Sequence, residues 1–118
     1  GHIVLRGGSS GPNYKHENVK KISSKLLQNN LPQKVMVDCS HGNSNKDFRR
    51  QSEVLVDVAE QIKNGETDIL GVMLESHLKD GNQKLLKRED LEYGKSVTDA
   101  CINIQTTEEL LSILYNSI

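Results

Sequence analysis

Three short apolar runs recur along the chain, and each ends at polar or glycine residues. The runs occupy residues 3–5, 34–39 and 68–74. Continuous apolar runs of this length are typical of strands that are buried on both faces of a parallel sheet. We therefore predict three parallel strands, each of them covered on both sides.

Segments with helical spacing of apolar side chains alternate with these runs. The first predicted helix spans residues 15–30, and the second spans residues 46–63 with Gly65 at its C′ position. The stripe of the first helix is Val19, Ile22, Leu26 and Leu27, and that of the second is Phe48, Gln51, Leu55, Val58, Ala59 and Ile62.

A long polar stretch over residues 78–95 separates the third strand from the last helix. Loops of this length usually carry function. Thr106 and Glu109 have the spacing of a capping box, which predicts a helix over residues 107–115 with Leu110, Leu111 and Leu114 on its apolar stripe. The order β-α-β-α-β-loop-α indicates an α/β fold with right-handed crossovers and no internal domain boundary.

Composition narrows the class of protein. The chain has 118 residues and a formal net charge of −1, which gives no electrostatic footprint for nucleic acid or an anionic membrane. No segment approaches the length of a membrane span, and no targeting signal is visible. The two cysteines lack CxxC spacing, which favours reduced thiols in a cytoplasmic protein. The chain opens directly into a strand-like run, from which we expect a fragment of a larger domain.

Candidate chemistry lies where the apolar runs end, and in the segment before the last helix. Arg6, His41 and Glu75 follow or close the three runs, and Asp99 lies in the sequence Ser-Val-Thr-Asp. Side chains at the carboxyl ends of parallel strands point into one shared mouth. One imidazole and two carboxylates form a mixed donor set that suits Mn, Fe, Co or Zn. Arg6, followed by two glycines, is a candidate for holding a phosphate or carboxylate.

Each of these residues also has a simpler interpretation. His41 could be a hydrogen-bonding loop residue, with Asp38 three positions before it, and Asp99 could cap a helix. Glu75 must be solvated, paired or metal-bound, and Arg6 could form a salt bridge. Among the remaining residues, Cys39 is read as a buried small hydrophobe rather than a ligand, and Cys101 as packing. Solvated or structural roles are assigned to Lys46, Arg49, Arg50, His2, His16 and His77.

Four segments together resemble class I 3-deoxy-D-arabino-heptulosonate 7-phosphate (DAHP) synthase. They are Leu-Arg-Gly-Gly at 5–8 with Pro-Asn-Tyr at 12–14, Val-Asp-Cys-Ser-His-Gly-Asn-Ser at 37–44, Gly-Val-Met-Leu-Glu-Ser-His-Leu at 71–78 with Gly-Asn-Gln at 81–83, and Tyr-Gly-Lys-Ser-Val-Thr-Asp-Ala-Cys-Ile at 93–102. Their order and spacing match over essentially the whole chain.

The resemblance implies a TIM barrel, of which residues 1–118 would be the C-terminal three β-α units of a single catalytic domain. The implied reaction condenses phosphoenolpyruvate with erythrose 4-phosphate and releases phosphate, in the shikimate pathway to aromatic amino acids. His41, Glu75 and Asp99 match metal ligands of the family. Arg6 matches an arginine that binds phosphoenolpyruvate, and His41 lies close to that substrate as a catalytic residue.

Departures from the family pattern limit what this chain does alone. The family's cysteine ligand, its Lys-Pro-Arg-Thr loop and other phosphate-binding residues have no counterpart here. We therefore expect an inactive fragment with open sheet edges that self-associates into a homo-oligomer. Two alternatives are a non-catalytic paralogue or binding module, and a related 3-deoxy-2-ulosonate phosphate synthase that uses arabinose 5-phosphate.

Overall fold

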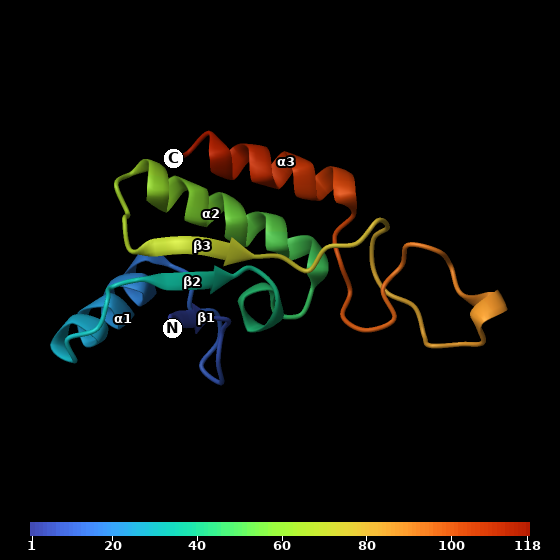
Figure 1. Ribbon diagram of the computed structural model, residues 1–118, viewed down its shortest axis with the longest axis horizontal. Helices are drawn as coiled ribbons and strands as arrows, with labels where there is room; N and C mark the ends of the chain where they lie inside the picture. Colours follow the sequence, from blue (N-terminus) through green and yellow to red (C-terminus); the bar gives the residue numbers. More distant parts are fainter.

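A computed structural model describes residues 1–118 and shows a three-stranded parallel sheet with three α-helices (Figure 1). The strands lie in the order β1-β2-β3, which is also their order along the chain. The strands are β1 (Ile3–Leu5), β2 (Val35–Asp38) and β3 (Ile69–Met73), and the α-helices are α1 (His16–Gln28), α2 (Gln51–Lys63) and α3 (Ile104–Tyr115).

The core lies on the face of the sheet that the helices cover. Val35, Val37 and Cys39 are fully buried at alternate positions along and just after β2, where they meet side chains of α1 and α2. Val4 and Met36 are paired neighbours in the sheet and occupy the other face. Val4 is 44% exposed because no helix covers that face.

The expectation that all three strands are buried on both faces is therefore wrong: Met36 of β2 is only partly buried, and the outer strands are more exposed still. In β1 only Leu5 is buried, and no residue of β3 is fully buried. Each outer strand has one unpaired edge, since the sheet ends after three strands.

The second helix begins five residues later than its apolar spacing predicts. Asn45 and Lys46 have φ values of 52° and 60°, in the left-handed region, which interrupts any helix there. Two 3-10 turns, His41–Ser44 and Phe48–Arg50, occupy the interval before α2 starts at Gln51. The helix ends as predicted, with Gly65 at φ 96° directly after the C-cap residue Asn64.

The last helix also begins differently from the prediction. Asn103, rather than Thr106, is its N-cap, and the Asn103 side chain accepts a hydrogen bond from the Thr106 backbone N–H at 2.8 Å. The first turn of α3 therefore includes three residues that the capping-box pattern had excluded. Leu110 is buried as expected, whereas Leu111 is half exposed.

Residues 78–98 form an irregular arm that extends away from the sheet (Figure 1). The chain returns from the arm through Cys101 and Ile102, and Ile102 forms a parallel bridge with Ser76 beyond the end of β3. This return brings Asp99 to the edge where β2 and β3 end. None of the three α-helices has the length and apolar composition that crossing a bilayer requires.

Candidate metal centre

Three side chains from different segments meet beyond the carboxyl end of the sheet. The His41 Nε2 atom lies 3.7 Å from Glu75 Oε1 and 3.6 Å from Asp99 Oδ2. One potential ligand atom from each residue lies within 4.8 Å of the other two. Ligand atoms around one ion are roughly 3.0–3.4 Å apart, so this spacing is slightly wider than a closed coordination shell. The donor set and the geometry fit a divalent metal ion.

Asp38 fixes the orientation of the His41 ring. Its Oδ2 atom lies 2.8 Å from His41 Nδ1, and its Oδ1 atom accepts a hydrogen bond from the Ser40 backbone N–H at 2.8 Å. Asp38 is 2% exposed, so its carboxylate is held by these contacts rather than by water. A carboxylate on Nδ1 keeps the proton there and turns the Nε2 lone pair toward Glu75 and Asp99. This is the arrangement that orients metal-binding histidines in proteins.

The loop that carries His41 is fastened to the loop that carries Arg6. The Gly42 N–H donates to the Arg6 carbonyl oxygen at 3.0 Å. The buried Asn43 side chain donates to the carbonyl oxygens of Leu5 and Asp38, at 2.9 and 2.8 Å. Asn43 thus ties the ends of β1 and β2 together directly beside the candidate metal ligands.

Arg6 is at the same edge of the sheet, but its side chain does not join the group of three. The side chain is exposed and forms no hydrogen bond or ion pair within the chain. Its guanidinium group is therefore free to bind an anion. The structure provides no salt-bridge partner for Arg6, in contrast to the simpler of the two sequence interpretations.

The remaining candidate residues are either buried in the core or paired with neighbouring charges. Cys39 is fully buried among core side chains, and burial, followed by the nearby charge of Asp38, raises the pKa of its thiol to about 12. The thiol stays protonated and packs as a small hydrophobe. Arg49 and Arg50 pair with Asp47 and Glu53 on the helix surface.

Sequence reasoning missed two polar side chains that support the site. It placed Gln51 on an apolar stripe, yet both ends of that side chain bind the backbone of Glu75. It left Asn43 without a role, although this residue is 1% exposed. A polar residue on an apolar stripe was the available signal for Gln51.

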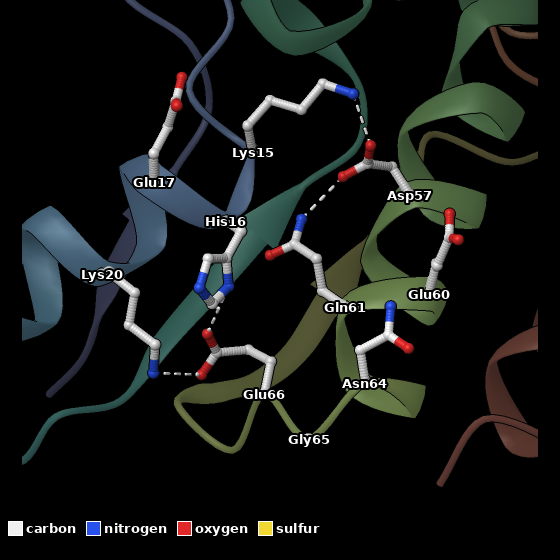
Figure 2. A pocket seen from close by; sticks show the side chains of 10 residues that line it. All are labelled: Lys15, His16, Glu17, Lys20, Asp57, Glu60, Gln61, Asn64, Gly65 and Glu66. Atoms are coloured by element: carbon white, nitrogen blue, oxygen red, sulfur yellow. Dashed lines mark hydrogen bonds and ion pairs between the residues drawn. The ribbon is translucent and has the colours of Figure 1, made fainter.

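A polar groove of about 750 Å³ between α1 and α2 lies apart from the metal centre (Figure 2). Figure 2 shows Lys20 and His16 reaching the buried Glu66, at 3.1 and 3.2 Å, and Lys15 paired with Asp57. Lys15, at the N-cap of α1, pairs with Asp57 of α2, and His16 and Lys20 of α1 pair with Glu66 in the turn that follows α2. The groove is thus lined by ion pairs that hold α1 against α2.

Three comparisons with known proteins indicate the same family. The family model of the DAHP synthetase I family matches residues 1–112. The Phe-sensitive phospho-2-dehydro-3-deoxyheptonate aldolase of Escherichia coli K12 is 50% identical over 117 residues, covering 99% of this chain and 33% of the relative. The tyrosine-inhibited enzyme of Schizosaccharomyces pombe is 44% identical and is matched over 98% of this chain and 32% of its own length.

A solved structure agrees with these sequence matches. The structure of phospho-2-dehydro-3-deoxyheptonate aldolase from Francisella tularensis SCHU S4 superposes with a TM-score of 0.95 at 48% identity. The superposition covers 100% of this chain and 34% of that protein. The chain therefore spans about a third of the length of these relatives.

Proposed function

The chain belongs to the DAHP synthetase I family, and on that premise we propose that it forms part of an enzyme that condenses phosphoenolpyruvate with erythrose 4-phosphate. The observation that carries the proposal is the position of His41, with Nδ1 held by Asp38 and Nε2 facing Glu75 and Asp99. An imidazole oriented in this way beside two carboxylates is suited to a divalent metal.

We assign the fold as the C-terminal three β-α units of a (β/α)8 barrel, within one catalytic domain. The parallel order β1-β2-β3, with the candidate ligands at one edge, supports this assignment. The exposed face at Val4 and the unpaired edges of β1 and β3 are the surfaces that five further strands would cover.

The proposed roles follow from the geometry of each residue. His41, Glu75 and Asp99 hold the metal, which is Mn, Fe, Co or Zn and which supplies Lewis-acid polarisation of the erythrose 4-phosphate aldehyde when bound. Arg6 holds the phosphate or carboxylate of phosphoenolpyruvate through its planar fork of N–H donors. His41, beside Arg6 across the joined loops, orients the same substrate.

The reaction forms one carbon–carbon bond and exchanges one carbon–oxygen bond at C2 for another. C3 of phosphoenolpyruvate attacks the aldehyde carbon, whose oxygen takes up a proton. Water adds at C2 and loses its protons, the bond from C2 to the phosphate oxygen breaks, and inorganic phosphate leaves. Holding both substrates in line contributes a large part of the rate. Arg6 is the only arginine that we assign to this task, so we propose that the isolated chain does not turn over substrate. We further propose that it acts in the cytoplasm within a homo-oligomer, without nucleic acid or membrane partners.

The first experiment is a titration of the purified chain with Co²⁺ or Mn²⁺, followed by calorimetry. We expect stoichiometric binding that weakens at least about tenfold in Glu75→Gln, because one of the two carboxylates among the three donors is removed. Glu53→Gln is the matched control, since Glu53 is an exposed carboxylate paired only with Arg50. Equal affinity in all three proteins would contradict the proposed metal centre.

A second assay addresses catalysis directly. Phosphoenolpyruvate is monitored with and without erythrose 4-phosphate and with a chelator. We expect no consumption by this chain. Consumption that requires both the second substrate and the metal would show that the chain, as an oligomer, completes the site by itself.

A further inference from the structure

Gln51 is a fully buried polar residue whose contacts the proposed reaction does not use. It is the first residue of α2 and is 0% exposed. A buried amide without hydrogen bonds is costly, so its partners determine whether the side chain is tolerated there. Gln51 has two partners, and both belong to Glu75.

The two hydrogen bonds use both ends of the Gln51 amide. Its Oε1 atom accepts from the Glu75 backbone N–H at 2.8 Å, and its Nε2 atom donates to the Glu75 carbonyl oxygen at 3.1 Å. Two residues of a hydrogen-bonded pair in an antiparallel ladder exchange both backbone hydrogen bonds in a comparable manner. Gln51 thereby takes the place of a strand neighbour at a position that lies beyond the end of β3.

Few other contacts hold Glu75 in place. Its carbonyl oxygen accepts a second hydrogen bond from the Ile102 N–H at 3.0 Å, whereas its N–H has Gln51 as its only partner. The peptide group before the Glu75 Cα atom is thus held by Gln51 alone, and the one after it is held by Gln51 together with Ile102. The direction of the Glu75 carboxylate toward His41 Nε2, 3.7 Å away, depends on those two peptide planes.

We propose that Gln51 is a positioning residue that aims the Glu75 carboxylate into the metal centre. This inference rests on the proposed metal-binding role of Glu75. The role requires a side chain of this length that both donates and accepts a hydrogen bond at its end. Methionine has the length and lacks both functions, whereas glutamate at neutral pH retains only the acceptor.

The test compares Co²⁺ binding by the wild-type chain, Gln51→Met and Val58→Ala. Val58 is also fully buried on α2, so its truncation weakens the same helix packing without touching Glu75. We expect Gln51→Met to lose about ten- to a hundredfold in affinity and to change the Co²⁺ visible absorption spectrum. Val58→Ala, compared at equal folded fraction, should keep both the affinity and the spectrum.

Gln51→Glu keeps the test decisive if Gln51→Met does not fold. It retains the acceptor for the Glu75 N–H and adds a negative charge, which by itself would strengthen cation binding. Weaker binding by this variant therefore reports lost positioning. Affinity and spectrum equal to wild type in both folded Gln51 variants would overturn the proposal, as would equal losses in Val58→Ala.

Hydrogen exchange at the Glu75 amide separates this inference from the proposed function. We expect the Glu75 N–H to be protected in the wild-type chain and to exchange faster in Gln51→Met, with or without metal. One outcome is that Glu75 protection depends on Gln51 but the wild-type chain binds no metal. This outcome contradicts the metal centre and, with it, the positioning role. Metal binding with Glu75 protection independent of Gln51 contradicts the positioning role alone.

Discussion

Gly7 and Gly42 lie so close together that a Cβ atom added to Gly7 would sit 2.5 Å from the carbonyl carbon of Gly42. The same contact brings the Arg6 loop against the His41 loop, where Gly42 N–H donates to the Arg6 carbonyl oxygen. The two loops are therefore in direct backbone contact. Glycine at position 7 is required both by this approach and by its φ of +80°.

Gly7→Ala should destabilise the chain and disturb the metal centre. The left-handed backbone alone costs about 1–3 kcal/mol for a residue with a side chain. Gly8→Ala is the matched control, because a Cβ atom there meets nothing within 4 Å. Urea unfolding of both variants measures the difference, and equal stability would contradict the requirement for close packing of the two loops.

Asp38→Asn should weaken metal binding through the His41 tautomer. If the new amide keeps its oxygen on the Ser40 N–H, its NH₂ group faces His41 Nδ1. Nδ1 must then accept, the proton moves to Nε2, and Nε2 no longer offers a lone pair to a metal. We expect a loss of about ten- to a hundredfold in Co²⁺ affinity by calorimetry. Asp47→Asn, an exposed carboxylate in a 3-10 turn, should leave the affinity unchanged.

Asn43→Ala should be one of the most destabilising single changes in the chain. The substitution leaves the carbonyl oxygens of Leu5 and Asp38 without their side-chain donor, and the Asn13 N–H without its 2.7 Å acceptor. Each unsatisfied buried group costs about 1–3 kcal/mol, so we expect a loss of about 3 kcal/mol or more. Chemical denaturation measures it, with Asn18→Ala on α1 as control. A loss of stability no larger than that of the control would contradict the role of Asn43 in joining the ends of β1 and β2.

The order of elements and the edge that carries the site could be predicted because both follow from local hydrophobic spacing. The start of α2 could not, since the positive φ of Asn45 and Lys46 depends on how the His41 loop packs against Arg6. The cap of α3 was equally ambiguous from sequence. Asn103 takes the position because Asp80, from the distant arm, accepts hydrogen bonds from its backbone and side-chain N–H groups at 2.7 and 3.1 Å.

The candidate site shows the same division between local and long-range information. Strand-end positions marked His41 and Glu75, and the segment before the last helix marked Asp99. The contact between Gln51 and Glu75, however, joins residues 24 positions apart. Such a contact leaves no periodic pattern in the sequence. The burial of the outer strands was overestimated for a related reason, because an apolar run does not tell how many strands its sheet contains.

Cys39 should make stability fall as pH rises above about 9. An unfolded thiol has a pKa of about 8.5, whereas burial raises the pKa of folded Cys39 to about 12. The stabilising contribution of the neutral thiol is complete below the unfolded pKa. It is lost as pH rises toward the folded pKa, by about 1.4 kcal/mol per pH unit.

The measurement is the free energy of unfolding against pH for wild type, Cys39→Ala and Val37→Ala. Both substitutions open space in the same core cluster, but only the first removes an ionisable group. The difference in free energy of unfolding between wild type and Cys39→Ala should shrink between pH 9 and about 12. The corresponding difference between wild type and Val37→Ala should stay constant, because both proteins keep the Cys39 thiol. Parallel curves for the two variants would show that Cys39 does not titrate in this range.

Lys20 pairs with Asp68 as well as with Glu66, and its stabilisation of the contact between α1 and the turn before β3 should fall when Asp68 is protonated. Burial alone would raise the pKa of Asp68, but the hydrogen bond and positive charge of Lys20, with the charge of Lys34, outweigh it and lower that pKa. A lowered carboxyl pKa contributes stability that is present above the unfolded value and is lost as pH falls through the folded one. Because the Lys20 side chain is 46% exposed, Lys20→Met should cost only about 0.5–1 kcal/mol at pH 7. Thermal unfolding of Lys20→Met and Lys21→Met, an exposed neighbour without an ion pair, should differ at pH 7 and converge as pH falls below the folded pKa of Asp68. A difference that persists in acid would show that Lys20 acts through packing of its aliphatic stem rather than through its charge.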